Sequence, residues 1–507
     1  MLSYGARVWR ARAAARALPS ILHRNYSTKE QRTPWVNPCR PRQLSSHGST
    51  DKLILPVDML NQAKERVYTP RLAYAVRRRD PELVGPAAHT PRETKHLSDL
   101  DDQEGLRVHL SLALFYRGAG GQNGVDPAGL IRRALGEALV HYYPLAGRLR
   151  EVEGQKPMVD CTGEGVLFVE ADADVRLAEL EAVGLMPPFP CWDQLLFDVE
   201  GSRGVFDCPL LHIQVTRLLC GSFVFALRFN HLICDGIGIA QFMNAIAELA
   251  RGLPSTTFAP VWSRELLNAR DPPMPSFTHR EFGRLLQPPP PAGDTVMRSF
   301  TFGAPDLATI KKSLPPLLRD TATTFEVLAA FLWRARAAVL ELPPGGNAPL
   351  MIVVNVRGAA EMSLPAGYYG NACVPSTVLV DPEVLRGCSL GDAVALVRQA
   401  KAAVTPEYAR SIIDEMVMVG RRFLWPANMF VLSDARRLGF DRVDFGWGEP
   451  VYAGPADTHF GVSFFITGKD RDGEDQVVVP VVLPWLAMDR FAKEVEKLLN
   501  PVKPPLS

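Results

Sequence analysis

The chain has 507 residues, more than the roughly 250–300 at which one hydrophobic core stops growing, so two domains are expected. Apolar residues make up 47% of it and charged residues 22%, a composition typical of folded globular proteins that argues against extensive disorder. The 56 Lys and Arg residues nearly cancel the 55 Asp and Glu residues, which argues against nucleic-acid binding through an overall positive charge.

The first 29 residues carry six basic side chains and no acidic one. This Ala- and Arg-rich composition is typical of a mitochondrial transit peptide, and Arg24-Asn25-Tyr26 before Ser27 resembles a matrix-protease cleavage site. The alternatives are a disordered extension and an upstream exon joined by gene prediction. In all three cases we predict that residues 1–66 form no part of the fold.

From about Tyr68 the apolar residues become periodic. Alternation over residues 108–114 predicts a strand. Asp126 then offers an N-cap followed by proline, and apolar residues at helical spacing after it predict a helix that packs on a sheet. The apolar run 222–230 predicts another strand, and the helix expected after it ends at Arg251 before a glycine.

Residues 253–295 interrupt this pattern with nine prolines, which predict a stiff crossover rather than a core element. Strands and helices are both expected beyond it. The predicted strands are 296–302, 350–356, 429–432, 462–467 and 477–483, and the predicted helices are 324–340, 390–404 and 486–499. The longest apolar run, Val477–Met488, carries two prolines and favours a buried strand, so no membrane-spanning helix is expected.

The eight cysteines contain no C-x-x-C pair, so their spacing excludes a zinc ribbon and a thioredoxin-type site. A disulfide framework is not expected in a chain of this size. We interpret the cysteines as free thiols of a protein in a reducing compartment.

Two short motifs of other enzyme classes are incomplete. Residues 387–391 match the G-x-S-x-G elbow of hydrolases, but the polar segment before them lacks the buried strand that this elbow needs. Ser389 and Asp392 instead predict a capping box that opens a helix. The glycines between Gly118 and Gly124 match neither nucleotide-binding fingerprint.

The most informative local pattern is H-x-x-x-D-G at His231–Gly236. His231 ends the predicted strand 222–230, and an imidazole with an ordinary pKa near ~6.5 suits proton transfer at neutral pH. Asp235 can fix the turn through hydrogen bonds or an ion pair. Spacing alone leaves open a satisfied core histidine beside a helix-capping aspartate.

This pattern and a second one together resemble a known family. Residues 444–448 spell D-F-G-W-G, and both motifs occur in the order and halves found in the BAHD acyltransferases. These plant enzymes move an acyl group from coenzyme A to an alcohol or amine. The resemblance spans about Tyr68 to Leu499, with supporting stretches at 97–102, 143–148, 355–358 and 367–371.

The resemblance implies a mixed α/β fold of two similar-sized domains with the active site at their interface. The N-terminal domain is expected over residues 67–252 and the C-terminal domain over 296–507, joined by the crossover 253–295. His231 is implied as the general base, acting in a ternary complex without a covalent acyl-enzyme or a metal. Asp235 is implied to turn toward an arginine and shape the loop that ends with Gly236.

The resemblance also implies roles in the C-terminal half. Ser433 is a candidate donor to the oxyanion, and the candidate coenzyme A contacts are Thr324, Ser433 and Arg437. The implied structural residues are Asp444, Gly446, Trp447 and Gly448. Asp444 is predicted to hold the C-terminal half together, with Arg357 as its partner.

Residues 160–168 and 451–455 are similar to the benzyl alcohol benzoyltransferase and taxane acyltransferase group. This implies that acyl-CoA (benzoyl, acetyl or similar) is the co-substrate, with no bound cofactor, and that the acceptor is a small alcohol. Cys373 stands where an aromatic residue is expected. An amine acceptor and a catalytically silent relative are the alternatives. The family predicts a monomer in the cytosol, whereas the N-terminal composition favours mitochondria.

Overall fold

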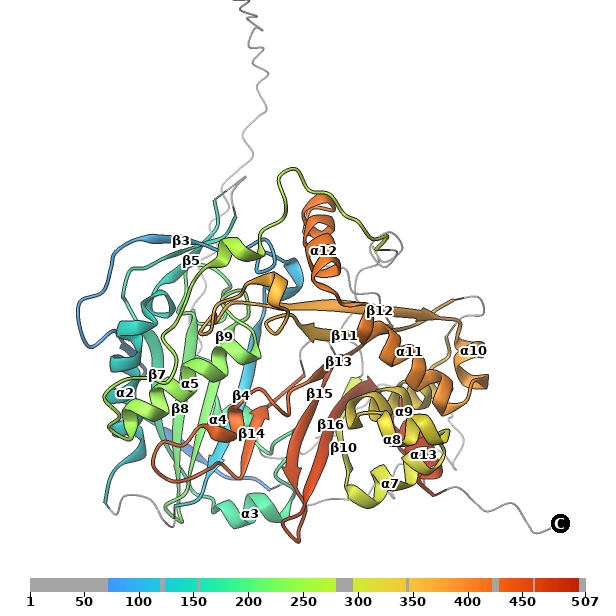
Figure 1. The fold of residues 1–507 in the computed structure, drawn as a ribbon. Helices are drawn as coiled ribbons and strands as arrows, with labels where there is room; N and C mark the ends of the chain where they lie inside the picture. The colour runs from blue at the N-terminus through green and yellow to red at the C-terminus, as the bar shows by residue number, and fades with distance from the viewer. Residues whose placement is uncertain are drawn as a thin grey trace, which may run out of the picture. The chain divides into compact units, whose positions relative to one another are not determined.

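A computed structural model describes residues 72–118, 124–152, 156–279, 295–342, 346–421, 428–458 and 461–500. The predicted N-terminal segment 1–66 lies outside these residues. Within them, the chain forms a mixed α/β fold with a seven-stranded sheet, a six-stranded sheet and a small three-stranded sheet (Figure 1). No helix in these ranges is both long and apolar enough to cross a bilayer.

The larger sheet has the strand order β1-β7-β8-β9-β4-β14, with β2 also paired to β7. Its strands are β1 (Val76–Arg78), β2 (Glu82–Val84), β4 (His109–Tyr116), β7 (Val166–Ala173), β8 (Leu211–Leu218), β9 (Phe223–Asn230) and β14 (Tyr452–Pro455). The small sheet contains β3 (Thr94–His96), β5 (Arg148–Arg150) and β6 (Met158–Asp160). The predicted strands 108–114 and 222–230 are confirmed as β4 and β9, whereas the sequence did not predict β7 and β8.

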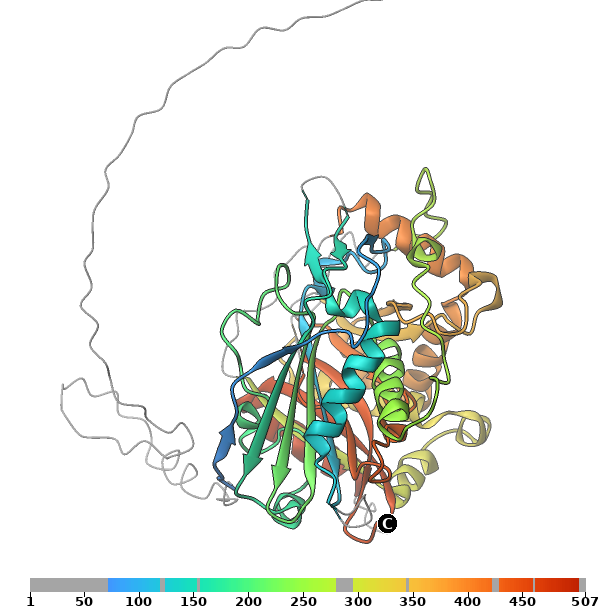
Figure 2. The ribbon, with the colours of Figure 1, turned by 90° about the vertical axis from the view of Figure 1, so that its left-hand side faces the viewer.

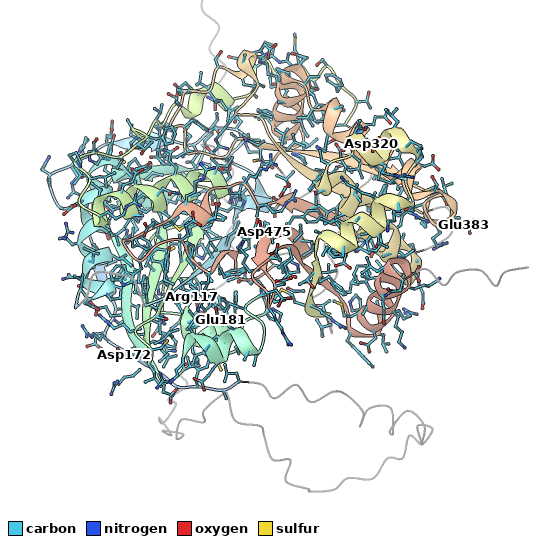
Figure 3. The ribbon with its side chains drawn as sticks, turned by 60° about the horizontal axis from the view of Figure 1, so that its bottom comes forward. Arg117, Asp172, Glu181, Asp320, Glu383 and Asp475 are labelled. Atoms are coloured by element: carbon cyan, nitrogen blue, oxygen red, sulfur yellow. The ribbon has the colours of Figure 1, made fainter. Side chains whose placement is uncertain are left out.

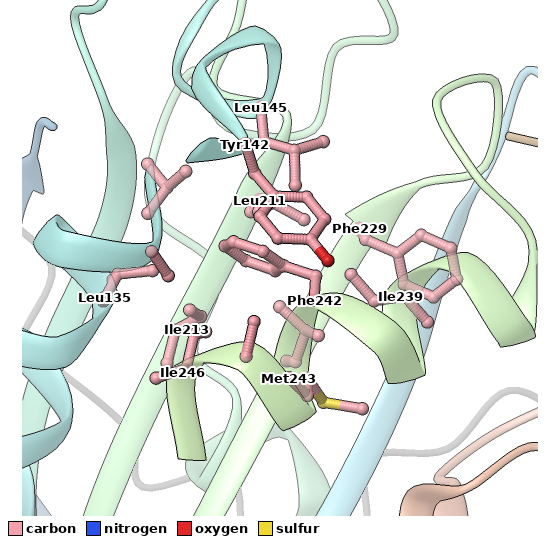
Figure 4. Packing of buried hydrophobic residues seen from close by; sticks show 14 of the residues in the cluster. Leu135, Tyr142, Leu145, Leu211, Ile213, Phe229, Ile239, Phe242, Met243 and Ile246 are labelled. Atoms are coloured by element: carbon pink, nitrogen blue, oxygen red, sulfur yellow. The ribbon is translucent and has the colours of Figure 1, made fainter. Parts of the chain in front are cut away.

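Two predicted helices pack on this sheet. They are α2 (Pro127–His141) and α5 (Gly236–Ala250), which lie side by side (Figure 2). Asp126 caps α2 as predicted, because its carboxylate accepts a hydrogen bond from the Gly129 amide at 2.9 Å. Tyr142, Phe242 and Ile213 belong to the apolar core between these helices and the strands (Figure 4).

Two further short helices of this half contact the sheet. After β4, Arg117 pairs with Glu181 of α3 (Leu177–Ala182) at 2.5 Å (Figure 3). Both side chains are solvent-exposed enough that such a pair contributes little stability. A further short helix, α4 (Trp192–Leu195), buries Leu195 against the same sheet.

The second sheet has the order β10-β16-β15-β13-β11-β12. Its strands are β10 (Thr295–Phe302), β11 (Ala348–Asn355), β12 (Cys373–Val380), β13 (Phe430–Asp434), β15 (Val462–Lys469) and β16 (Asp475–Pro484). The helices of this half are α7 (Ala304–Lys312), α8 (Pro316–Thr321), α9 (Thr324–Val339), α10 (Pro382–Gly387), α11 (Leu390–Ala403), α12 (Pro406–Met418) and α13 (Trp485–Leu499). All strands and helices predicted beyond the crossover are present. The elements that were not predicted there are β12, β14, α7, α8, α10 and α12.

Ser389 caps α11 as the sequence predicts. Its hydroxyl accepts a hydrogen bond from the Asp392 amide at 3.1 Å, and its own amide donates one to the Asp392 carboxylate at 3.0 Å. This is the reciprocal bonding of a capping box. The serine thus has a local structural role in the loop before a helix, at the sequence that resembles a hydrolase elbow.

The C-terminal half completes the sheet of the N-terminal half. β14 pairs antiparallel with β4, and Tyr452 lies opposite Phe115. The Tyr452 ring contacts Phe115 and Phe189 at centroid distances of 6.1 and 5.0 Å. The segment predicted as the C-terminal domain therefore supplies an edge strand to the other sheet.

The crossover is partly buried, which corrects the prediction that it contains no core element. Arg264 and Leu267 of a short 3-10 helix are 1% and 0% exposed. Arg270, further along, bonds the Asp414 carboxylate of α12 at 2.6 Å. The prolines stiffen the segment, but polar and apolar side chains between them anchor it to both halves.

Candidate active site

A cavity of about 570 Å³ lies between the two sheets. Strand β4 contributes Leu110 and Leu112, β9 contributes Phe229, and β11, β12 and β13 line the opposite side. The cavity brings together these predicted site residues: His231, Asp235, Gly236, Thr324, Ser433 and Arg437. Cys373, singled out as a departure from the family pattern, lines it as well.

The turn that carries His231 connects β9 to α5. The His231 amide donates to the Val108 carbonyl at 2.9 Å, and the side chain of Asn230 accepts from the Leu232 amide at 3.1 Å. Since α5 starts at Gly236, a turn of five residues places the partly buried imidazole at the cavity wall.

The hydrogen bonding of His231 fixes its tautomer. Nδ1 lies 3.0 Å from the Cys234 carbonyl oxygen, which can only accept, so Nδ1 carries the proton. This leaves the lone pair on Nε2 available as a base. Burial lowers the pKa of His231, against the opposing effects of the Cys234 carbonyl and the Asp235 charge. The imidazole is therefore neutral at physiological pH.

Asp235 caps α5 and faces an arginine, as predicted. Its Oδ1 accepts from the Ile237 and Gly238 amides at 3.1 and 3.0 Å. Arg357 donates two hydrogen bonds to the carboxylate at 2.7 and 2.9 Å. Burial alone would raise the pKa of Asp235, but the Arg357 charge and these hydrogen bonds hold it below its usual range. Asp235 is thus an ionised structural anchor for the turn.

The predicted pairing of Arg357 with Asp444 is wrong. Arg357 follows β11, whose end lies beside the His231 turn, so its guanidinium reaches Asp235 and the Gly370 carbonyl, the latter at 2.5 Å. Asp444 instead pairs with Arg251, at the end of α5, at 3.2 Å. Two separate ion pairs therefore connect the halves.

The D-F-G-W-G loop holds the two halves together rather than the C-terminal half alone, which corrects a second prediction. The Phe445 ring lies 5.6 Å from that of Tyr116 and 5.2 Å from that of Phe225, both in the larger sheet. The Trp447 ring lies 5.2 Å from that of Phe223. The Asp444 carboxylate shapes the loop by accepting from the amides of Gly446 at 2.7 Å and Gly448 at 2.8 Å.

Both glycines of that loop have positive φ, 108° for Gly446 and 84° for Gly448, a conformation that glycine adopts at little cost. None of the structural candidates in this group, nor Arg357, lines the cavity in the described part of the chain.

The polar side of the cavity gathers at the ends of α9 and β13. Thr324 is the first residue of α9, and Ser433 lies near the end of β13. Three basic residues line this side: Lys401, Arg436 and Arg437. Another, Arg421, lines the cavity where it pairs with Asp99 and Asp102. The sequence predicted only Arg437, although the adjacent pair Arg436-Arg437 after a predicted strand was a signal for Arg436 as well.

Metal ligation has no support in the ranges that the structure describes, because no group of three or more His, Cys, Asp or Glu side chains there could hold an ion. The site chemistry is that of a histidine base beside an apolar wall, with cations at the opposite side. Such an arrangement can remove a proton from an acceptor and bind a phosphate-bearing substrate.

Comparison with known proteins agrees with this geometry. The Transferase family model matches residues 74–498. The chain is 47% identical over 441 residues to benzyl alcohol O-benzoyltransferase of Petunia hybrida, covering 85% of this chain and 95% of the relative. It is 44% identical over 433 residues to alcohol acyltransferase 16 of Actinidia chinensis var. chinensis, with the same coverages.

Solved structures show the same fold. Vinorine synthase has a TM-score of 0.65 at 21% identity, covering 84% of this chain and 98% of that one. TRI101 of F. graminearum, complexed with coenzyme A and T-2 mycotoxin, has a TM-score of 0.66 at 15% identity, with coverages of 78% and 96%. By the family model and these relatives, the chain belongs to the Transferase family of BAHD acyltransferases.

Proposed function

We propose that this chain transfers an acyl group, benzoyl, acetyl or similar, from acyl-CoA to a small alcohol and forms an ester. The observation that carries the proposal is the His231 imidazole, held on the cavity wall as a neutral base by the Cys234 carbonyl. The 47% identity to a benzyl alcohol O-benzoyltransferase supports the choice of substrates.

In the proposed mechanism His231 Nε2 accepts the hydroxyl proton while the alcohol oxygen attacks the thioester carbonyl carbon. The resulting tetrahedral oxyanion accepts a hydrogen bond from Ser433. Collapse breaks the carbon–sulfur bond, and the departing thiolate takes the proton from the imidazolium. Ester and free coenzyme A leave, and no covalent acyl-enzyme forms.

The two sides of the cavity bind different parts of the substrates. We place the phosphates of coenzyme A at the basic side, near Arg437, with a polar contact from Thr324. Leu110, Leu112 and Phe229 offer an apolar surface near His231 for the acyl group and the acceptor. No bound cofactor or metal is needed for this chemistry.

The test is a screen of the purified protein with benzoyl-, acetyl- and hydroxycinnamoyl-CoA against benzyl alcohol, aliphatic alcohols and amines. Thiol release gives the rate, and mass spectrometry identifies the product. We expect esters with at least one alcohol. If amides were the sole products, the acceptor would be an amine and not an alcohol. Thiol release without any transfer product would refute the proposal.

Ser433 has a matched control elsewhere in the same half. Ser433→Ala should lower kcat, because the oxyanion loses a donor, whereas Ser389→Ala removes a hydroxyl that caps α11 away from the cavity. Equal kcat for the two variants would remove Ser433 from the mechanism.

We also propose that the enzyme works as a monomer in the cytosol, in keeping with the family resemblance. The basic, acid-free first 29 residues favour mitochondrial import instead. Fusing residues 1–40 to a fluorescent reporter tests the address. Import of the reporter, with a mature N-terminus at Ser27 in the native protein, would overturn the cytosolic assignment. Light scattering of the purified chain tests the monomer.

A further inference from the structure

A second buried polar cluster bonds the backbone of the His231 turn. It consists of Asp101, Arg264 and Asn371, which come from three distant segments and are 0%, 1% and 3% exposed. Arg264 Nη1 donates to both Asp101 oxygens at 3.0 and 3.1 Å. Asn371 donates to Asp101 Oδ1 through its amide and its side chain, at 3.1 and 2.8 Å.

The same donors reach the backbone of the turn. Asn371 Nδ2 donates to the His231 carbonyl at 2.9 Å and to the Leu232 carbonyl at 3.3 Å. Arg264 Nη2 donates to the Ile233 carbonyl at 2.7 Å. The next carbonyl, that of Cys234, is the one that accepts from His231 Nδ1. Four successive carbonyls are therefore each held by a named donor.

The position of the Arg264 guanidinium is itself tightly fixed. Its central carbon lies 4.4 Å from the centre of the Trp262 ring and 5.3 Å from that of Tyr369. A Cβ at Gly370 would stand 1.9 Å from Nη1, so this position accepts only glycine without displacing the guanidinium. The aromatic rings and the Gly370 backbone therefore confine the guanidinium to a single position.

We propose that Asp101, Arg264 and Asn371 are positioning residues for the general base. By fixing the carbonyls of residues 231–233 they aim the Cys234 carbonyl at Nδ1, which keeps the proton there and the lone pair on Nε2. The proposal rests on the proposed function of His231 as the base. If the cluster only joined three segments, its loss would lower stability but would leave the imidazole tautomer and kcat unchanged.

The test variants are Asn371→Ala and Arg264→Lys. The first removes the donors to two turn carbonyls and leaves the Asp101–Arg264 ion pair. The second keeps the positive charge beside Asp101 but has no planar fork to reach the Ile233 carbonyl as well. The control is Arg270→Lys, because Arg270 comes from the same crossover, pairs with buried Asp414 through a side chain that is 32% exposed, and bonds no carbonyl of the turn.

We expect both test variants to lower kcat by about 10- to 100-fold, the scale of loosened catalytic geometry, with a change in KM for acyl-CoA below about threefold. Arg270→Lys should lose thermal stability with kcat within about twofold of the starting protein. Equal kcat for test and control variants at equal loss of stability would overturn the proposal.

Nitrogen NMR of histidine-labelled protein supplies a readout that does not need turnover, with His231→Gln identifying the signal. The unaltered protein should show Nδ1 protonated at neutral pH, and the test variants should exchange with the Nε2-protonated form. A tautomer unchanged in the variants would refute the positioning role. If the variants show the expected tautomer change but the unaltered protein transfers no acyl group, the positioning role stands and the proposed function is refuted.

Discussion

Two aspartate-containing turns connect the halves of this acyltransferase, and they differ in burial. Asp235 and Arg357 have side chains 7% and 15% exposed, and the carboxylate also bonds three backbone amides. Asp444 and Arg251 are 27% and 34% exposed. Both turns pair an acid of one half with an arginine of the other, so residue types alone do not tell the catalytic turn from the structural one. The neighbouring histidine and the degree of burial do.

The largest difference between the two turns should appear in turnover, when His231 is replaced. His231→Ala removes the base and should lower kcat by about 10²–10⁴-fold, the usual contribution of general-base catalysis. The melting temperature should stay close to that of the unaltered protein, since the imidazole makes one local hydrogen bond. Near-normal turnover in a folded variant would show that another group removes the proton.

The two aspartates should differ in stability. Asp235→Ala leaves a buried arginine unpaired and should cost about 3–5 kcal/mol of unfolding free energy. Asp444→Ala loses a half-exposed ion pair and two turn hydrogen bonds, and should cost about 1–2 kcal/mol. Urea denaturation of each variant measures both values.

A double-mutant cycle then checks each partner. Asp235 with Arg357 should show strong coupling, and Asp444 with Arg357 should be additive because they share no contact in the structure. Coupling between Asp444 and Arg357 would restore the pairing that the sequence alone had suggested.

The pH dependence of kcat/KM should distinguish the two turns, because only the Asp235 turn carries the base. Because burial lowers the pKa of His231, the imidazole stays unprotonated below the ordinary value of 6.5, and the acid limb of kcat/KM should lie below that pH. Asp235→Asn removes a neighbouring negative charge and leaves Arg357 unpaired, so it should move the limb lower still. Asp444→Asn should leave it in place, and a limb above pH 6.5 in the unaltered protein would contradict this assignment.

The smallest effect should come from a residue in neither turn. Ser389→Ala removes the cap of α11 and should cost about 1 kcal/mol. Turnover should not change, because the hydroxyl bonds only its own helix end. A large loss of kcat with intact stability would instead indicate that Ser389 of the G-x-S-x-G pattern takes part in catalysis.

Which features could be predicted from the sequence depends on how far apart along the chain the interacting residues lie. The start of α2 and of α11 could be predicted, because Asp126 and Ser389 make their capping bonds within three residues. Strand β7 begins with the continuous apolar run Val166–Val169, which is compatible with a strand or with part of a buried helix. Strand β8 had a usable signal, because Leu211, Ile213 and Val215 alternate with polar residues. The start of α12 had a usable signal in Thr405 before a proline, where the Thr hydroxyl accepts from the Tyr408 amide.

The site divides in the same way. His231 and Asp235 were predicted from a local motif and a family resemblance. Which arginine reaches which aspartate depends on where the end of β11 meets the turn, and spacing along the chain carries no such information. Arg264 lies in a proline-rich segment without periodicity, so nothing local marked it as the donor to the Ile233 carbonyl.

The pairing of β14 with β4 has a consequence for synthesis on the ribosome. Tyr116, at the end of β4, donates to the carbonyl of Val443, 327 positions later. The edge of β4 therefore stays uncovered while most of the C-terminal half is translated, and an uncovered edge invites pairing with other chains. The N-terminal half is thus an incomplete folding unit during synthesis, and its larger sheet is closed only after β14 (Tyr452–Pro455) has been made.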